Sequence, residues 1–303
     1  MENPKIRFKG FTKDWEQRKL GDIYGSIGNA FVGTATPYYA EHGHFYLESN
    51  NVKDGQINHN AEIFINDEFY EKQKDKWLHT GDMVMVQSGH VGHAAVIPEE
   101  LDNTAAHALI MFRNPKEEIE PYFLNYEYQT DKAKKQIENI TTGNTIKHIL
   151  ASDMQEFVVD IPKYEEQKVI ASYFCNLDNL ITLHQRKCEQ TKKLKKYMLQ
   201  KMFPRNGAKV PEIRFDGFTY DWEQRKLNEV AEKICVGFVG TCEKFYTDES
   251  GIPMYRTGNL NGLSLNRDDL KYVTNEFHQH NQKSQLKAGD ILILSLIHIS
   301  EPT

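Results

Sequence analysis

The sequence predicts a mixed α/β (α+β) protein that is built from a tandemly duplicated unit and carries a long spacer helix of coiled-coil type. Three observations support this fold class. A segment near the N-terminus recurs 207 residues later, and the forty residues 164–203 contain neither Gly nor Pro. Short apolar runs bounded by turn-forming residues occupy much of the remaining chain, as expected for strands. At 303 residues the chain is long enough for about two domains.

The duplication begins with two nearly identical segments. Residues 5–20 (the first box) read KIRFKGFTKDWEQRKL, and residues 212–227 (the second box) read EIRFDGFTYDWEQRKL, so that thirteen of sixteen positions agree. The match continues downstream between the ranges 31–34 and 238–241, 78–82 and 286–290, and 83–86 and 291–294. Such self-similarity predicts a repeated structural unit. We therefore expect the apolar run 291–294 to form a strand, like its counterpart 83–86.

Six runs in the first unit predict strands because they are apolar or alternating and end at Gly, Asn or Pro. These runs are 45–47, 62–65, 83–86, 94–97, 108–112 and 157–161. Residues 121–140 contain no further Pro or Gly and predict one helix, with Pro121 in its first turn. The pattern predicts a curled sheet with helices packed on it.

The run 164–203 lies between Pro162 and Pro204 and predicts a single helix about 60 Å long. One seam steps alternately by three and four residues and predicts packing against a second long helix. The seam consists of Phe174, Leu177, Ile181, His184, Cys188, Thr191, Lys195, Met198 and Met202. Its polar members weaken the pattern, and a surface helix on its own domain is the alternative.

The end of this predicted helix is strongly basic. Residues 186–209 contain nine Lys or Arg residues and a single Glu, within a chain of net charge −6. Such a run is either a solvated face or a surface for phosphates or an acidic partner. The mild overall acidity does not exclude DNA binding, because that function needs only a basic face.

Cysteine usage and hydropathy indicate a reducing, non-membrane setting. The four cysteines form no CxxC pair, and Cys175 and Cys188 lie too far apart on the predicted helix for a disulfide. There is no apolar leader and no run of eighteen apolar residues. We expect a cytoplasmic protein with no membrane partner.

Beyond Leu294 the two copies no longer correspond. The first copy continues QSGHVGH, whereas residues 295–303 read SLIHISEPT, and no counterpart of 88–203 follows. We expect residues 295–303 to be a non-native or disordered tail; the alternative is a naturally shortened protein. The expected segments are 1–160, a first domain; 161–209, the long helix and linker; 210–294, an incomplete second domain; and 295–303.

The sequence predicts no catalytic residues and no cofactor. It lacks the phosphate loop GxxxxGK[ST], the GxSxG elbow and the HExxH zinc helix. The spacing of several histidines suggests a metal site. No Cys or carboxylate pattern accompanies them, so we expect them to be structural or solvent-exposed. They are His42, His44, His90, His93 and His107. An enzyme with a site in these loops remains an alternative, which stoichiometric zinc would support.

Polar loops that follow the predicted strands and helix are typical of nucleic-acid contact. Asn and Gln can make bidentate hydrogen bonds to an adenine edge, glycine allows close backbone approach, and a lysine can neutralise a phosphate. The candidate DNA-binding residues are Asn50, Asn51, Gln87, Ser88, His90, Thr142, Asn144 and Lys147. The same residue types occur in ordinary turns, which is the alternative for each of them.

Several segments together resemble the specificity subunit of type I restriction-modification systems. They are the two DWEQRKL boxes, GDMVMVQSGHVG, TTGNTIKHI, FVVDIP and the helix opening EEQKVIASYFCNLDNLI. The resemblance extends nearly to Leu294. It implies a non-catalytic subunit in which two target-recognition domains each read half of a bipartite site in double-stranded DNA. Long helices set the gap between the half-sites.

The resemblance also implies partners. Methyltransferase subunits dock on the specificity subunit to modify adenine, and restriction subunits join to cleave DNA. Here 1–160 and 210–294 correspond to the two target-recognition domains, the second incomplete, and the long helix lacks its intramolecular mate. We therefore expect aggregation or a homodimer through the seam. A coiled-coil scaffold that binds only protein, without DNA specificity, is the alternative.

Overall fold

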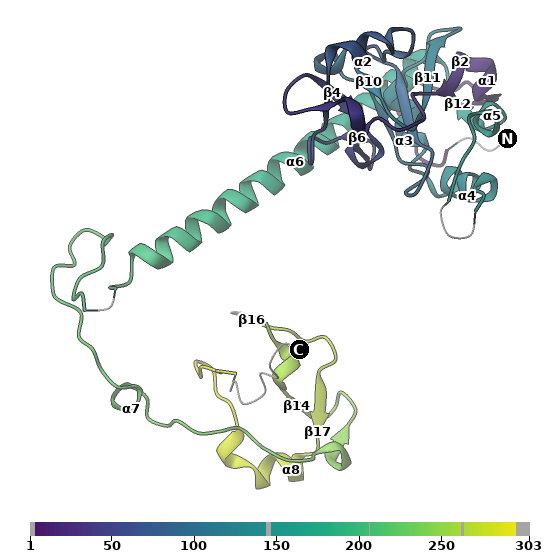
Figure 1. The fold of residues 1–303 in the computed structure, drawn as a ribbon. Coiled ribbons are helices and arrows are strands. Elements are labelled where there is room, and N and C mark those ends of the chain that lie inside the picture. Colours follow the sequence, from purple (N-terminus) through teal and green to yellow (C-terminus); the bar gives the residue numbers. More distant parts are fainter. Residues whose placement is uncertain (1–3, 144–146, 206, 262–263, 295–303) are drawn as a thin grey trace. The chain divides into compact units, whose positions relative to one another are not determined.

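The computed structural model describes residues 4–143, 147–205, 207–261 and 264–294. The chain divides into two compact units, Met1–Lys195 and Lys196–Thr303 (Figure 1). Both units contain helices and strands, which confirms the mixed α/β class. The expected tail 295–303 and the candidate residue Asn144 lie outside the described residues. The finer division into target-recognition domains stays a prediction.

The strands of the first unit are β1 (Glu16–Lys19), β2 (Tyr24–Asn29), β3 (Tyr39–Ala40), β4 (His44–Leu47), β5 (Val52–Lys53), β6 (Gln56–Ile57), β7 (Phe64–Ile65), β8 (Met83–Val86), β9 (Ala94–Val96), β10 (Ala105–Ala106), β11 (Leu109–Pro115) and β12 (Val158–Ile161). Its helices are α1 (Leu20–Ile23), α2 (Asp67–Glu71), α3 (Pro121–Glu127), α4 (Asp131–Ile140), α5 (Ala151–Gln155) and α6 (Tyr164–Lys201), the last of which ends within the second unit.

The central sheet of the first unit has the strand order β2-β11-β8-β9, with every pair antiparallel. Strand β8 is buried on both faces because successive side chains point to opposite sides. Met83 and Met85 join one core cluster, which includes Phe123 of α3. Val84 and Val86 join a second cluster on the other face. The sheet is therefore covered on both sides.

All six predicted strands of the first unit are confirmed as β4, β7, β8, β9, β11 and β12. Strand β2 was not predicted because its sequence, YGSIGN, resembles a turn. A Cβ at Gly25 would lie 2.9 Å from the carbonyl oxygen of Asn114, so the close approach of β11 requires a glycine there.

The prediction of one helix over 121–140 is wrong, because two helices, α3 and α4, occupy this range. Thr130 starts a new helix, since its hydroxyl accepts a hydrogen bond from the Ala133 backbone N–H at 3.2 Å. The placement of Pro121 in the first turn of α3 is confirmed. A threonine followed by an acidic residue is an N-cap signal that marks this break.

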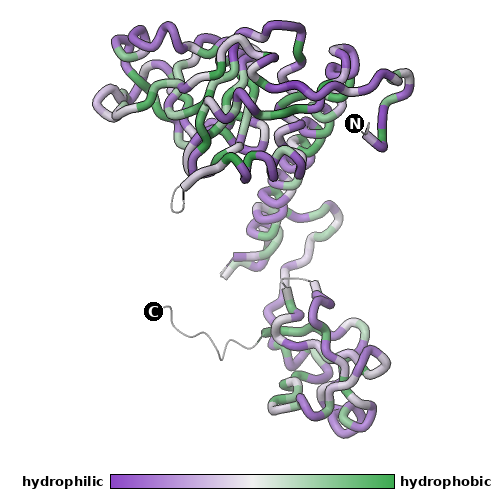
Figure 2. The backbone as a smooth tube through the Cα atoms, turned by 90° about the vertical axis from the view of Figure 1, so that its right-hand side faces the viewer, coloured by the Kyte–Doolittle hydropathy of each residue, from purple (hydrophilic) through white to green (hydrophobic). Residues whose placement is uncertain are grey.

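Helix α6 confirms the predicted long helix and ends two residues early, at Lys201 rather than Phe203. Its 38 residues correspond to a length of about 57 Å. Only Glu166, Gln167 and Ala171, near its start, are buried. Figure 1 shows α6 leaving the first unit as a single helix, and hydrophobic and hydrophilic residues interleave along it in Figure 2.

The second unit repeats a smaller set of elements. These are α7 (Leu227–Val230), β13 (Tyr246–Thr247), β14 (Ile252–Met254), β15 (Leu260–Asn261), β16 (Ser264–Leu265), β17 (Lys271–Val273) and α8 (Asn275–His280). The sheet order β13-β17-β14 repeats the order β3-β7-β4 of the first unit. The hairpin β15–β16 likewise repeats β5–β6. The predicted duplication is therefore confirmed at the level of topology.

The prediction of a strand at 291–294 is wrong. These residues have no regular structure, and Ile291 and Ile293 are 86% and 78% exposed. The counterpart strand β8 pairs with β9 and β11. The described part of the second unit contains no equivalent of either strand, so the backbone of 291–294 lacks partners.

Candidate nucleic-acid interface

Two of the predicted loops meet at the end of β8. Residues 87–93 follow β8, and residues 141–149 follow α4. The backbone N–H of Ile149 donates to the Gln87 carbonyl at 2.9 Å, and that of Gly89 donates to the Lys147 carbonyl at 3.1 Å. Thr142 and His148 exchange backbone hydrogen bonds of 2.9 and 2.8 Å. The two loops therefore form one backbone-linked surface.

We call this feature the paired-loop surface, made of Gln87, Ser88, His90, Thr142, Lys147 and His148. Isolated antiparallel bridges join Ser88 to His148 and Thr142 to His148. The structure thus brings together five of the predicted DNA-binding residues, namely all of this set except His148. His148 was not predicted, although it directly follows Lys147 in the same motif.

Glycines shape both loops. Gly89, Gly92 and Gly143 have φ values of +79°, +85° and +97°, a region that other residues rarely adopt. At Gly92 a Cβ would also lie 2.8 Å from the side chain of Ile137 on α4. Glycine at position 92 therefore lets the loop lie directly on α4.

The side chains of the paired-loop surface carry the chemistry that nucleic acids require. His90, Thr142, Lys147 and His148 are exposed, while Gln87 and Ser88 are half-buried. The surface presents one ammonium, two hydroxyls, an amide and two imidazoles. An ammonium suits a phosphate, and amide and hydroxyl groups can bond base edges.

Asn51 has a structural role instead. It is only 2% exposed, and its Oδ1 accepts from the Glu48 backbone N–H at 3.1 Å. Its Nδ2 donates to the carbonyls of Asn58 and Asn60 at 3.1 and 3.2 Å. Its counterpart Asn259 makes the same kind of loop-closing bonds in the second unit. Because this amide has no accessible edge, we do not include Asn51 in the proposed interface.

Asn50 is exposed but lies in a separate loop, where its carbonyl accepts from Asn58 at 3.2 Å. The neighbouring hairpin β5–β6 approaches the central sheet through Gly55, which bridges to Ala95 of β9. The Asp54 backbone N–H donates to Nδ1 of His93 at 3.2 Å. His93 therefore anchors the hairpin beside the loop after β8.

The described residues contain no group of three or more His, Cys, Asp or Glu side chains placed to hold a metal ion. His44 stacks on Tyr70 with ring centroids 3.6 Å apart. His107 lies 3.2 Å from a Glu48 carboxylate oxygen and 2.9 Å from the Gly33 carbonyl. These two rings take part in packing and local hydrogen bonding, whereas His42 and His90 are exposed.

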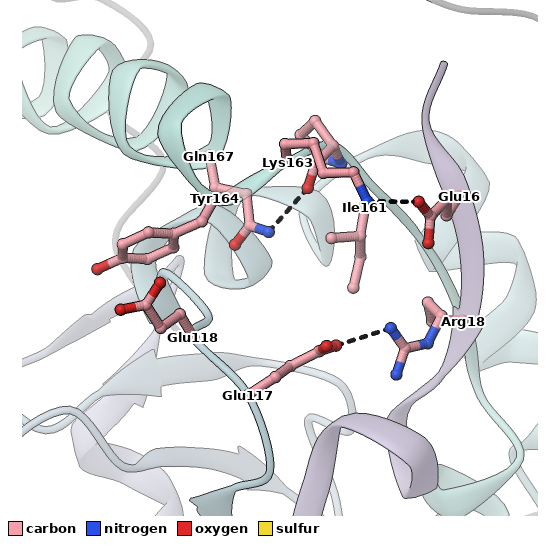
Figure 3. Close-up of a pocket in the computed structure, with 9 residues that line it drawn as sticks. Glu16, Arg18, Glu117, Glu118, Ile161, Lys163, Tyr164 and Gln167 are labelled. Carbon is pink, nitrogen blue, oxygen red and sulfur yellow. Dashed lines mark hydrogen bonds and ion pairs between the residues drawn. The ribbon is translucent and has the colours of Figure 1, made fainter. Parts of the chain in front are cut away.

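A polar hollow of about 280 Å³ lies at the base of α6 (Figure 3). Ion pairs of 2.7 Å cross its rim between Lys163 and Glu16 and between Arg18 and Glu117. The hydrogen bond from Lys163 lowers the pKa of Glu16 below its usual value. Since these charges are paired with one another, the hollow is best described as the joint between β1, β12 and α6.

Sequence reasoning missed the contact that fixes the first box to this joint. Arg7 donates from Nε and Nη2 to the two carboxylate oxygens of Glu166, both at 2.6 Å. Glu166 is only 2% exposed, and Phe8 packs edge-to-face on Tyr173 with ring centroids 5.5 Å apart. A glutamate in the first turn of a helix is common, so nothing in the sequence distinguished Glu166 from the solvent-exposed Glu165.

A second, half-buried carboxylate lies at the end of α3. Glu127 accepts the Asp160 backbone N–H at 2.7 Å, while its Oε2 has no hydrogen-bond partner among the described residues. Burial raises the pKa of Glu127 to about 8. The next contact along α3 is the Tyr126 hydroxyl, which donates to Asp178 of α6 at 2.6 Å.

The predicted seam of α6 is partly open. Phe174, Leu177 and Ile181 are 41%, 37% and 54% exposed, although Phe174 also contacts the Tyr126 ring at 5.1 Å between centroids. Met198 is half-buried, and Met202 lines an apolar hollow of the second unit. Further exposed apolar residues of α6 lie outside the predicted seam: Leu180, Leu183, Leu194, Tyr197 and Leu199.

Within the described residues, no helix combines the length and the apolar character that crossing a membrane would require.

The chain is similar to a known protein domain and to known specificity subunits. Residues 12–193 match the type I restriction modification DNA specificity domain. The chain is 27% identical over 290 residues to the type I restriction enzyme MjaX specificity subunit of Methanocaldococcus jannaschii, covering 90% of this chain and 67% of that protein. It is 24% identical over 286 residues to the MjaVIII specificity subunit of the same organism, covering 93% and 63%.

Two solved structures are also similar. The S subunit of a type I restriction-modification system from M. genitalium has a TM-score of 0.46 at 17% identity, covering 67% of this chain and 49% of that chain. The HsdS subunit from Thermoanaerobacter tengcongensis has a TM-score of 0.44 at 19% identity, covering 82% and 63%. The chain spans about two thirds of the length of its curated relatives. Because the specificity-domain match covers more than half of its residues, the chain belongs to the family of type I restriction-modification specificity subunits.

Proposed function

We propose that this chain selects the DNA sequence for a type I restriction-modification complex, and that its first unit reads one half of a bipartite site. The observation that carries this proposal is the paired-loop surface. Backbone hydrogen bonds and a bridge link the loop that contains Gln87, Ser88 and His90 to Lys147, His148 and Ile149, and His148 is bonded to Thr142. Pre-arranged loops with amide, hydroxyl and ammonium groups suit combined base and phosphate contact.

In this proposal α6 separates the reader from the rest of the complex and offers a docking surface. Methyltransferase subunits dock on the helix and the units, and restriction subunits join the assembly. The specificity subunit itself contributes no chemistry. Two readers on one face of a duplex need a spacing near a multiple of the helical turn, roughly 34 Å, which a rigid helix can set.

A homodimer through the open seam is the proposed assembly of the chain. Leu177 and Ile181 expose apolar surface at positions that face a partner in an antiparallel helix pair. Two copies related by a twofold axis would present the same reader twice. Such a dimer would recognise a symmetric split site.

The alternative function, a scaffold that binds only protein, draws support from the same exposed residues of α6. The two functions differ in their dependence on salt. A DNA reader loses affinity steeply as salt rises, because each phosphate contact releases counterions. A protein scaffold has no such DNA affinity.

The test measures binding of the full chain, with a methyltransferase subunit of the family, to mixed-sequence duplexes between about 50 and about 200 mM salt. Lys147→Ala should weaken binding and reduce the magnitude of the slope of log K against log salt by about 1. Lys9→Ala, which removes an exposed lysine outside the paired-loop surface, is the matched control and should change neither quantity. Equal effects of the two variants, or no DNA affinity, would reject the proposed reader surface.

A further inference from the structure

The hairpin β5–β6 directs one pair of side chains to the core and the next pair to solvent. Val52 lies opposite Ile57, and Lys53 lies opposite Gln56. Val52 is buried in the second core cluster, and Ile57 packs against the same cluster. Because successive residues of a strand point to opposite faces, Lys53 and Gln56 project away from the core, and both are exposed. The ribbon therefore has an apolar inner face and a polar outer face.

The tip of this hairpin is fixed to the rest of the unit. An isolated hairpin is marginally stable at best in water, and these strands have only two residues each. Here the Gly55 carbonyl accepts a hydrogen bond from Nδ2 of the buried Asn125 at 2.8 Å, and Gly55 bridges to Ala95 of β9. The Asp54 backbone N–H is bonded to His93. The outer face thus has a fixed backbone, which lowers the entropy cost of binding a ligand.

His93 joins the hairpin to the loop that follows β8. The Val86 backbone N–H, at the end of β8, donates to the His93 carbonyl at 2.8 Å. Nδ1 of the same histidine accepts the Asp54 backbone N–H at 3.2 Å. One residue therefore contacts both the end of β8 and the tip of the hairpin. This places the tip beside the loop that contributes to the paired-loop surface.

The second unit repeats the frame of this hairpin. In the first unit the Asn58 backbone N–H donates to the Asn51 carbonyl at 2.8 Å. The same bond joins Asn266 to Asn259 at 2.7 Å, at the base of the hairpin β15–β16. Two leucines replace the inner pair of β5–β6, so these positions stay apolar. The residues that build the hairpin are thus identical or of the same kind in both copies.

The outward pair differs in both of its members. Asn261 and Ser264 occupy the register positions of Lys53 and Gln56. A common frame that carries different polar residues suits two readers of different half-sites, because the frame sets the position while the outward groups select the bases. Among the described residues, neither Lys53 nor Gln56 has a side-chain hydrogen bond or ion pair, so both are available to a ligand.

We propose that Lys53 and Gln56 determine part of the DNA sequence that the first unit reads, an inference that rests on the proposed function and adds the hairpin to the paired-loop surface. A two-stranded ribbon fits the major groove, where Lys bonds O6 and N7 of guanine and Gln bonds N6 and N7 of adenine. Side chains opposite each other on a ribbon start about 5 Å apart, between one and two base-pair steps of about 3.4 Å. The pair therefore reads a guanine and an adenine at most two steps apart.

The test selects bound sequences from a pool of randomised duplexes, with the full chain and a methyltransferase subunit of the family. The wild type should enrich a guanine and an adenine at most two steps apart. Gln56→Ala should lower the preference for the adenine about tenfold, and Lys53→Ala should do the same for the guanine, because each loses a base contact. Lys9→Ala, an exposed lysine of the first box, is the matched control and should change no position.

A double variant, Lys53→Asn with Gln56→Ser, places the pair of the second unit on the frame of the first. It should lose both preferences and still bind DNA. Since both side chains project into solvent, urea denaturation should give the same stability for these variants as for the wild type.

The outcomes separate this inference from the proposed function. If sequence preferences are unchanged in all hairpin variants while Lys147→Ala still reduces the salt dependence, the role of the hairpin is rejected and the paired-loop reader stands. If Lys53→Ala weakens binding to all sequences equally, Lys53 contacts a phosphate and does not select a base, which also overturns the inference. A wild-type chain without DNA affinity would reject both proposals.

Discussion

Arg7 and Arg214 occupy the same position of the duplicated box, but among the described residues Arg7 alone of the two pairs with a buried carboxylate. Arg7→Ala would leave Glu166 charged and 2% exposed without its partner. We expect the free energy of unfolding of the first unit to fall, because the buried carboxylate loses both of its charge-assisted hydrogen bonds from the guanidinium. Arg214→Ala, the matched control, should change the free energy of unfolding by less than about 0.5 kcal/mol. Urea denaturation of the full chain measures both, and equal losses would show that the ion pair is not what stabilises the joint.

Glu127 predicts a pH dependence of stability. Its pKa is about 8 in the folded protein, against a usual value of 4.5. Below about pH 4.5 the carboxyl is protonated in the folded and unfolded states alike. Between about pH 4.5 and 8 only the unfolded chain releases the proton, so the free energy of unfolding falls as pH rises, by at most about 1.4 kcal/mol per pH unit. Above about pH 8 this contribution no longer changes.

The variant Glu127→Gln isolates this contribution, because an amide does not titrate. The free energy of unfolding of the variant minus that of the wild type should increase steadily between pH 5 and pH 8, as measured by urea denaturation at several pH values. A difference that stays constant over this range would mean that the carboxyl is already ionised in the folded protein.

At the scale of elements, the exposed stripe of α6 predicts the oligomeric state. Ile181→Glu places a charge in the middle of the open seam and should convert a dimer into a monomer in sedimentation velocity experiments. Asn179→Glu, on the opposite side of α6, adds the same charge and should leave the dimer intact. A wild-type chain that sediments as a monomer at all concentrations would contradict the proposed seam.

The same elements show how far sequence reasoning extends. Strand β8 and helix α6 were predicted closely, because MVMV is apolar on both faces and the helix contains neither Gly nor Pro. The same four residues adopt different structures in the two boxes. EQRK forms strand β1, paired with β12, in the first unit, whereas it has no regular structure at 223–226 in the second. Whether these residues form a strand depends on pairing with β12, about 140 residues away, and no local sequence pattern indicates that partner.

The candidate site was predictable to a similar extent. Residue type and position in a loop after a strand or helix identified Gln87, Ser88 and Lys147, which lie in the two backbone-linked loops. The same criteria also selected Asn51, since they do not distinguish an amide that faces solvent from one that closes its own loop. The buried pair of Arg7 and Glu166 escaped notice because both residues are usually exposed.

At the scale of the whole molecule, the two units differ in core size. The first unit has three clusters of buried residues, whereas the described part of the second has one, built on Cys242, Val273 and Phe277. Stability depends on the apolar area that a unit buries. We expect two unfolding transitions in calorimetry, the second unit melting first, and limited proteolysis should cut beyond residue 204 before it cuts the first unit. A single cooperative transition would contradict this expectation.

A small tilt at the start of helix α6 becomes a large displacement at its far end. The helix is about 57 Å long, and its start is held by the bidentate pair between Arg7 and Glu166 and by the packing of Phe8 on Tyr173. A rotation of the helix by about 5° at these contacts displaces its far end by about 5 Å, which exceeds the step of about 3.4 Å between base pairs. If α6 sets the gap between half-sites as proposed, small side-chain movements at the joint would be magnified into whole steps along a duplex, and the salt bridge between Arg7 and Glu166 would limit the error in that gap.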